Sequence, residues 1–372
     1  MKPIKGLWQQ IVSFENLYKA YRAAAKGKRF RDEVLAFSDN LEENLLDLRA
    51  ELISGTYEVG GYREFYVYEP KKRLVMALPF RDRVVQWAIY RIVNPLFARG
   101  YIEDSFACIE GRGIHSAAKR IQYFTQLVLR NCGGRGNSLK LDISKYFYRI
   151  NHDVLMAILS RWFADRELLD LLERIIRSAV PFGLPAGKSP GEAERIYGVG
   201  MPIGNLTSQM FANLYLNEID QYIKRELRVH CYVRYMDDMV IVDGDKKRLH
   251  EYRRKIESFL NERLKLDLNS KTVIRPLTLG IDFCGYKIWD SHIILRKPTA
   301  LKMRRRLRKL QKDYASGAAS WPDVKMTLAS YNGMLKHCNS YRLTRKIFGG
   351  YSEEGWQEGW FILRRELPEQ QN

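Results

Sequence analysis

The sequence predicts an α+β fold in which an antiparallel sheet is backed by helices. Two apolar, β-prone runs, 230–234 and 239–242, flank the tetrapeptide Tyr235-Met236-Asp237-Asp238, which is the pattern of a β-hairpin with two acids at its tip. Residues 139–143 alternate like a further strand, whereas 154–159 carry apolar residues at helical spacing. A chain of 372 residues can bury a sizeable core and suggests two or three compact units.

The remaining elements follow in chain order. Residues 1 to about 60 are charged and predicted to be helical, and a helix start is expected at Asn151-His152-Asp153. Residues 181–200, rich in Pro and Gly, predict an inserted loop. A helix is expected from Met210 to about Arg225. Residues 301–310 combine helical apolar spacing with dense positive charge, which suits either a helix along a nucleic-acid backbone or a solvated basic helix.

The acidic residues predict a metal site. Adjacent carboxylates such as Asp237 and Asp238 repel each other unless a cation lies between them, so the pair suits a hard divalent ion; a solvated turn is the alternative. Asp142 lies near the end of the strand predicted over 139–143, and a sheet could bring it to the hairpin. Three converging carboxylates can hold two magnesium ions for phosphoryl or nucleotidyl transfer. A solvent-exposed acid at a strand end is the alternative for Asp142.

Composition narrows the class of partner. A net charge of +19 indicates a polyanionic partner. A basic membrane binder is the competing explanation, but no stretch approaches a span of ~20 apolar residues. The N-terminal segment has no signal-peptide core, and the five cysteines are scattered without metal-ligand spacing. We therefore expect a reduced, cytoplasmic location and no membrane association.

These residues together resemble a known family. Asp142 followed by Phe147, and then Tyr235-Met236-Asp237-Asp238, are similar to motifs A and C of reverse transcriptases. The resemblance runs from about residue 71 to about 286 and implies a right-hand polymerase with fingers, a palm sheet backed by helices and a helical thumb. It implies an N-terminal helical extension over 1–60, fingers and palm over 61–290, and a thumb over 291–372.

The resemblance assigns roles to the site residues. Asp142, Asp237 and Asp238, with the Ile143 carbonyl, would bind two Mg²⁺ ions, for which Mn²⁺ is a possible substitute. Phe147 would be the aromatic gate that crowds a nucleotide 2′-hydroxyl; without the motif it would be one more core aromatic.

A third segment, Met201 to Gln209, resembles motif B and narrows the family. Most reverse transcriptases carry Gln before the Gly and Pro after the Ser, whereas this chain has Ile203 and Gln209. This substitution resembles reverse transcriptases of diversity-generating retroelements, which copy a template-repeat RNA and misincorporate at its adenines. Taken alone, Gly204 permits close approach of backbone at a helix entry.

Segments on the N-terminal and C-terminal sides of these motifs also resemble the family. Residues 264–272 resemble motif D, in which Lys271 would protonate the leaving pyrophosphate; a surface cation is the alternative. Residues 281–288 resemble the primer-grip hairpin, with candidate residues Phe283, Cys284, Gly285 and Tyr286. Basic residues of the fingers would meet the incoming triphosphate, because guanidinium and ammonium groups suit phosphate oxygens. The candidates are Lys72, Arg73 and Arg81. The alternative for at least half of these basic residues is a solvent-exposed face of the protein.

The resemblance also implies partners: a template RNA, an RNA/DNA hybrid, deoxynucleoside triphosphates and a small accessory retroelement protein, in a bacterial or phage setting. Two alternatives stay open. The chain could be a group II intron, retron or phage-defence reverse transcriptase, or an inactive RNA-binding scaffold. The intact Asp142, Asp237 and Asp238 argue against the scaffold.

Overall fold

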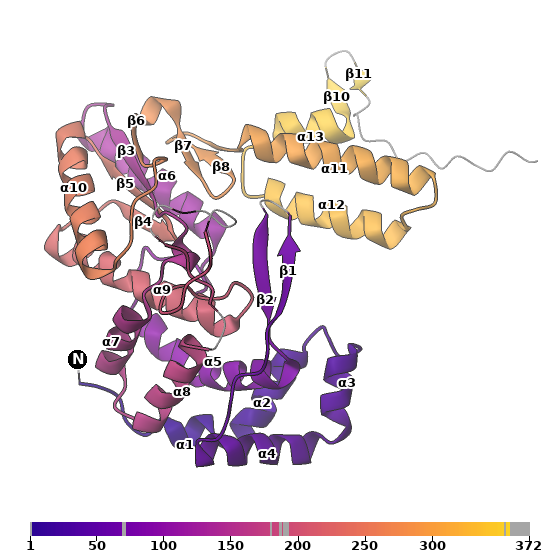
Figure 1. The fold of residues 1–372 in the computed structure, drawn as a ribbon. Helices are drawn as coiled ribbons and strands as arrows, with labels where there is room; N and C mark the ends of the chain where they lie inside the picture. The colour runs from indigo at the N-terminus through magenta and orange to yellow at the C-terminus, as the bar shows by residue number, and fades with distance from the viewer. Residues whose placement is uncertain are drawn as a thin grey trace, which may run out of the picture. The chain divides into compact units, whose positions relative to one another are not determined.

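The computed structural model describes residues 2–68, 72–178, 181–185, 188, 193–352 and 355–357, and it is a mixture of helices and antiparallel sheets (Figure 1). The predicted α+β class is therefore confirmed. Contacts within the chain define two compact units. The first comprises Met1–Gly113, Lys140–Met239 and His250–Val273, and the second comprises Ile114–Leu139, Val240–Leu249 and Ile274–Asn372. The predicted domain limits at 60 and 290 stay a prediction.

The N-terminal region is helical, as predicted. Its helices are α1 (Trp8–Ile11), α2 (Phe14–Ala25), α3 (Asp32–Asp39) and α4 (Leu41–Ser54). Ser13 caps α2 by accepting a hydrogen bond from Asn16 N, and Gly55 ends α4 in the left-handed region at φ 74°. Helix α2 packs against α4 and against the long α5 (Phe80–Gly100), so these helices form one layer of the first unit (Figure 1).

An antiparallel hairpin connects α4 to α5. It consists of β1 (Arg63–Val67) and β2 (Arg73–Ala77), with Tyr66 opposite Leu74. Strand β1 is exposed along its length, whereas β2 buries Leu74 and Met76. The alternation in β2 thus gives this hairpin one face toward the protein interior.

A four-stranded sheet has the strand order β4-β5-β3-β6. The strands are β3 (Asn137–Asp142), β4 (Tyr232–Tyr235), β5 (Asp238–Asp243) and β6 (Val273–Pro276). The two-residue connection between β4 and β5 makes them the predicted hairpin. Four successive residues of β5, Met239 to Val242, are buried, which explains their unbroken apolar run.

The helices between β3 and β6 are α7 (His152–Trp162), α8 (Arg166–Ile176), α9 (Leu206–Gln221) and α10 (Lys246–Arg263). The Asn151 side chain caps α7 by accepting from Val154 N at 3.0 Å, as the sequence predicts. Helix α9 packs on α5 and α7, and it continues into a π-helical turn, Tyr222–Glu226. It begins four residues before the predicted start at Met210, because the polar residues of motif B already form its first turn.

The second unit contains α6 (Ile114–Asn131), which packs on strand β8. The antiparallel sheet β7-β8-β9 comprises Ile281–Phe283, Tyr286–Ile288 and Ile293–Leu295. Three helices follow, α11 (Lys297–Ala315), α12 (Trp321–Leu335) and α13 (Tyr341–Phe348), and then the short hairpin β10 (Gly350–Ser352) and β11 (Gly355–Gln357). The predicted basic helix over 301–310 is part of α11, which buries only Met303 and Leu307.

Two further expectations concern loops and membranes. The predicted loop over 181–200 lies partly outside the described residues; within its described part, Gly183 pairs with Ile196 in an isolated antiparallel bridge. Among the helices that the structure describes, none combines the length and apolarity needed to cross a bilayer.

Candidate active site

Two carboxylates lie at the tip of the β4–β5 hairpin. Asp237 occupies the turn and Asp238 is the first residue of β5. Met236, the other turn residue, has a φ of 53°, in the left-handed region that residues other than Gly rarely adopt. The turn is therefore a strained conformation that the surrounding structure has to hold.

Asp142 ends the neighbouring strand β3, and the motif D segment runs alongside it. Asn269 N donates to Asp142 O at 2.7 Å, and Ile143 forms an antiparallel bridge with Leu268. Thr272 Oγ1 accepts from Asp142 N at 3.4 Å. These backbone contacts orient the end of β3, where Asp142 and the Ile143 carbonyl are the expected metal ligands.

The three aspartates interact electrostatically within the first unit. The pKa of the Asp237 carboxyl is raised to about 6, chiefly by burial and then by the negative charges of Asp238 and Asp142. A backbone hydrogen bond and the positive charge of Arg73 act in the opposite direction. Lys140 provides a second cation, with its Nζ 3.2 Å from Asp238 Oδ1. The site thus brings together three interacting carboxylates, with Arg73 and Lys140 as nearby cations.

This donor set fits a hard divalent ion by its chemistry, because mutually repelling carboxylates are stabilised by a cation between them. Among the residues that the structure describes, no three His, Cys, Asp or Glu side chains are already arranged to hold a metal ion. Asp238 instead faces Lys140. The metal roles of the three aspartates and of Ile143 stay a prediction.

Phe147 and Ile203 pack against one small apolar cluster. Both are half-buried, and the cluster is formed by Leu74, Met76 and Phe182. The main chain joins the same segments, since Met201 N donates to Phe147 O at 2.7 Å. The proposed sugar gate and motif B therefore lie beside strand β2.

Gly204 is required by a close approach of backbone. Its φ is 130°, and a Cβ there would lie 2.5 Å from the Met76 carbonyl oxygen. Immediately before it, the Ile203 carbonyl accepts a hydrogen bond from Met76 N at 2.8 Å. The expected close approach at the entry to α9 is present, and β2 is the segment that approaches.

The other candidate residues of the first unit have varied surroundings. Gln209 is exposed on α9, and its Oε1 accepts from Cys108 Sγ at 3.9 Å. Lys72 Nζ lies 4.5 Å from the Tyr66 ring centroid. The fingers residues thus differ: Arg73 acts on the pKa of Asp237, whereas Arg81 forms an ion pair with Glu51.

Lys271 is exposed, and its backbone N donates to Asn269 Oδ1 at 3.0 Å. The segment that bears it is therefore held beside Asp142, while its role as proton donor stays a prediction.

The primer-grip candidates form a hairpin of the second unit. Strands β7 and β8 pair Phe283 with Tyr286, and the turn residues Cys284 and Gly285 have φ values of 45° and 89°. Gly285 therefore adopts the expected sharp bend. Tyr286 is anchored within this unit, because its hydroxyl donates to Met334 O at 3.2 Å and lies 3.0 Å from His115 Nδ1.

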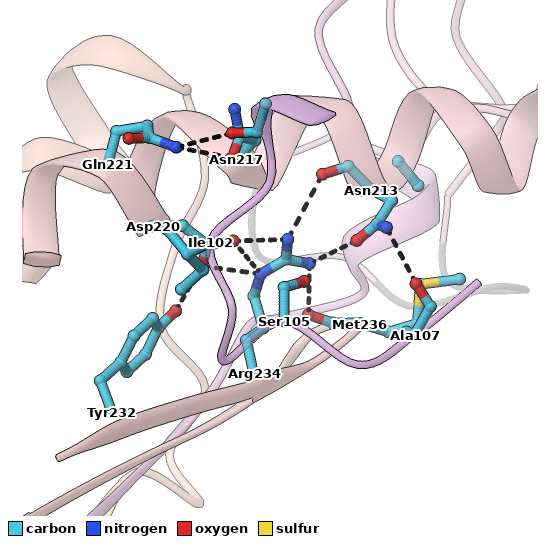
Figure 2. A network of polar contacts seen from close by, with 12 residues as sticks. Ile102, Ser105, Ala107, Asn213, Asn217, Asp220, Gln221, Tyr232, Arg234 and Met236 are labelled. Atoms are coloured by element: carbon cyan, nitrogen blue, oxygen red, sulfur yellow. Dashed lines mark hydrogen bonds and ion pairs between the residues drawn. The ribbon is translucent and has the colours of Figure 1, made fainter. Parts of the chain in front are cut away.

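Two features of the site were not predicted from the sequence. Lys140 faces Asp238. The sequence offered a signal for this, because strand alternation places residues 140 and 142 on the same face. Arg234, buried behind the hairpin turn, pairs with Asp220 (Figure 2). The signal was a charged residue within the apolar run 230–234, which is rare in a buried strand.

Comparison with known proteins gives a family match over most of the first unit and part of the second. Residues 69–288 match the sequence profile of the family described as reverse transcriptase (RNA-dependent DNA polymerase). This segment covers more than half of the chain and includes all three aspartates and the motif B, motif D and primer-grip segments.

Two curated relatives are similar to this chain at low sequence identity. Protein YkfC of Escherichia coli (strain K12) is 28% identical over 279 residues, which cover 65% of this chain and 70% of that protein. The group II intron-encoded protein LtrA of Lactococcus lactis subsp. cremoris is 23% identical over 343 residues, 74% of this chain and 54% of that protein. The chain therefore spans about half the length of LtrA. A solved structure of apo telomerase from Candida tropicalis aligns with a TM-score of 0.49 and 12% identity, over 81% of this chain and 64% of that chain.

Proposed function

The chain belongs to the reverse transcriptase family of RNA-dependent DNA polymerases, and from this premise we propose that it extends a DNA primer on an RNA template with deoxynucleoside triphosphates. The observation that carries the proposal is that Asp142 ends β3 while Asp237 and Asp238 lie just before and at the start of the adjacent strand β5, so that their charges interact. Such a group of carboxylates suits the metal-assisted displacement at phosphorus that polymerases perform.

The proposed mechanism assigns a task to each group. Asp142, Asp237, Asp238 and the Ile143 carbonyl hold Mg²⁺, or Mn²⁺ in its place. When bound, the ions supply activation of the attacking oxygen and stabilisation of the leaving oxygen. Lys271 donates a proton to the departing pyrophosphate.

The nucleotide pocket is assigned to the segments around β2. Phe147 excludes a 2′-hydroxyl, supported by its packing beside Leu74 and Met76. The charge of Arg73 near Asp237 supports its role at the triphosphate. Lys72 and Arg81 are assigned to the same group, with Arg81 released from Glu51 when the nucleotide binds. Ile203, Gly204 and Gln209 are assigned to nucleotide binding, with residue 203 beside the nascent pair, and residues 283–286 hold the primer.

We further propose that the chain serves a diversity-generating retroelement and copies a template-repeat RNA with errors at adenines. The support is the pair Ile203 and Gln209 in motif B, which depart from the usual Gln and Pro. An accessory retroelement protein and a cytoplasmic location belong to this proposal.

An intron-encoded reverse transcriptase is the second candidate. It is supported by the similarity to LtrA, which is a group II intron-encoded protein. Error profiles distinguish the two, because only the retroelement enzyme should concentrate its errors at template adenines.

Primer extension on a defined RNA template, followed by sequencing of the cDNA, tests both levels of the proposal. Mg²⁺-dependent cDNA synthesis supports the polymerase, and an RNA-binding protein that makes no cDNA would be the inactive scaffold. Errors concentrated at adenines support the retroelement, whereas uniformly accurate cDNA supports the intron-type enzyme. Two near-identical repeats in the neighbouring DNA, differing mainly at adenines, would be independent support.

A further inference from the structure

A buried ion pair lies directly behind the turn that carries Asp237. Arg234 on β4 and Asp220 on α9 both have fully buried side chains, with 0% exposure. Arg234 Nε lies 2.8 Å from both carboxylate oxygens of Asp220, and Nη2 donates to Oδ2 at 2.6 Å. Tyr232 adds a hydrogen bond from its hydroxyl to Asp220 Oδ1 at 2.7 Å (Figure 2). The carboxylate is thus well satisfied, as a buried charge requires.

The same guanidinium reaches the turn. Arg234 Nη1 donates to the carbonyl oxygen of Met236 at 3.3 Å and to Asn213 Oδ1 at 2.9 Å (Figure 2). Asn213 lies on α9, about two helical turns before Asp220, so the planar guanidinium joins the helix to the turn. A lysine at this position could not make these contacts together, because it lacks the rigid fork of donors.

The turn needs such a restraint. Met236 has a φ of 53°, which is unfavourable for a side chain with a Cβ. Met236 directly precedes Asp237 and Asp238, so a relaxed turn would move both carboxylates. Arg234 is therefore placed to control the position of the metal-binding groups without touching them.

The main chain of Arg234 holds a third segment. Arg234 N donates to Asp104 O at 2.9 Å, and Phe106 N donates to Arg234 O at 3.0 Å. Asn213 Nδ2 also donates to Ala107 O at 2.9 Å. The loop 104–107, helix α9 and the turn are therefore joined at one residue.

We propose that Arg234 and Asp220 are positioning residues that hold the Met236–Asp237 turn in its strained conformation and couple it to α9, the helix that carries Gln209. The pair sets where Asp237 and Asp238 stand relative to Asp142. This proposal rests on the proposed polymerase function only for its effect on activity; its effect on the turn is independent of that function.

The test uses the full chain with the double substitution Arg234→Met and Asp220→Leu. Apolar residues of similar size leave no charge unpaired, and buried ion pairs are often replaced in this way without loss of stability. Arg234→Lys is the conservative variant, and Arg177→Met is the control, since it removes an exposed arginine that pairs with Asp153 at 2.6 Å. The readouts are the melting temperature, amide hydrogen exchange over 232–240 without metal or nucleic acid, RNA binding, and primer extension.

We expect the folded double variant to exchange amides over 232–240 at least about tenfold faster than wild type, with RNA binding unchanged. Its extension rate should fall by about 10- to 100-fold, because a misplacement of ~1 Å at a reacting centre has effects of this size. The control should match wild type in all readouts.

Wild-type exchange and a wild-type rate in the folded double variant would overturn the proposal. If the double variant does not fold, Arg234→Lys is the deciding variant. Wild-type amide exchange over 232–240 in Arg234→Lys would likewise overturn the proposal. Absence of extension by the wild-type chain would instead remove the proposed function, while the exchange comparison would still test the role of the pair.

Discussion

Lys140 and Asp238 face each other across adjacent strands, with Nζ of Lys140 3.2 Å from Oδ1 of Asp238. The ammonium neutralises one of the carboxylates that are proposed to bind metal. A divalent ion at Asp238 must therefore compete with a cation that the protein itself supplies.

The first prediction follows from this competition. Lys140→Met should lower the Mg²⁺ concentration that gives half-maximal extension, because one competing cation is removed. Both side chains are partly exposed, at 23% and 34%. Such pairs contribute about 0–1 kcal/mol, so the change should be at most about fivefold. Titration of extension against Mg²⁺ measures it. Lys255→Met, which removes an exposed lysine paired with Glu251, is the control. A higher Mg²⁺ requirement in Lys140→Met would contradict the competition.

The second prediction concerns the carboxylates. Asp237→Ala or Asp238→Ala should abolish Mg²⁺-dependent extension and leave RNA binding nearly unchanged, because the +19 charge supplies most of the affinity for phosphate. Primer extension and filter binding measure the two properties. Asp153→Ala is the control, since its side chain is 78% exposed and forms an ion pair with the surface residue Arg177. Extension at the wild-type rate by Asp237→Ala would contradict the assignment of Asp237 as a metal ligand.

The third prediction concerns sugar selection. Phe147→Ala should raise incorporation of ribonucleotides relative to deoxyribonucleotides, because removal of the ring opens space for the 2′-hydroxyl. Competition between the two nucleotide types measures the ratio. Phe182→Leu is the matched control, since Phe182 lies in the apolar cluster against which Phe147 packs and is not assigned to the sugar. An active Phe147→Ala enzyme with unchanged selectivity, or an equal change in Phe182→Leu, would argue against the gate.

The fourth prediction concerns fidelity. Ile203→Gln should lower misincorporation opposite template adenine more than opposite the other bases, because Gln restores a hydrogen-bonding group beside the nascent pair. One hydrogen bond contributes about 0.5–1.5 kcal/mol, so discrimination should change by up to roughly tenfold. Sequencing of cDNA from a defined RNA gives the error rates. An active variant with an unchanged adenine error rate would show that Ile203 does not determine fidelity.

The fifth prediction concerns stability and pH. His152 is buried, with Nε2 2.8 Å from Gly200 O, and burial lowers its pKa below the ordinary value of 6.5. The unfolded chain therefore binds a proton more readily than the folded chain as the pH falls below about 6.5. This residue should make the free energy of unfolding decrease toward acid pH, by at most about 1.4 kcal/mol per pH unit.

Denaturant unfolding between pH 5 and pH 8, a range around the ordinary pKa of histidine at about 6.5, measures this slope. His152→Gln keeps an N–H donor but cannot take up the proton, so it should flatten the slope. His250→Gln replaces an exposed histidine on α10 and is the control. An identical slope in wild type and His152→Gln would assign the acid sensitivity to other groups.

Local patterns predicted the elements that carry the carboxylates. The β4–β5 hairpin, the strand ending at Asp142 and the start of α7 after Asn151 are all present, because alternation, turn residues and capping act over a few residues. The start of α9 was placed at Met210 instead of Leu206, because its first turn is polar and does not extend the apolar pattern.

Long-range pairings were beyond local patterns. The contact of Lys140 with Asp238 depends on which strands are neighbours, and the contact of Arg234 with Asp220 depends on how α9 packs behind β4. Neither follows from spacing along the chain. Gly204 was recognised as a position of close approach, but that the Met76 carbonyl would be its neighbour required the placement of β2.

The link between β2 and motif B has a consequence for how this enzyme could diverge. Met76 N bonds to the carbonyl of Ile203, and Gly204 leaves the space for that approach. This hydrogen bond uses the main chain of residue 203, whereas the Ile203 side chain packs beside Leu74 and Met76. A different side chain at residue 203 keeps this main-chain hydrogen bond, so under the proposed role of Ile203 in fidelity the accuracy of copying can change while the link to β2 is retained. Gly204 is the more constrained of the two positions, because any Cβ there would meet the Met76 carbonyl.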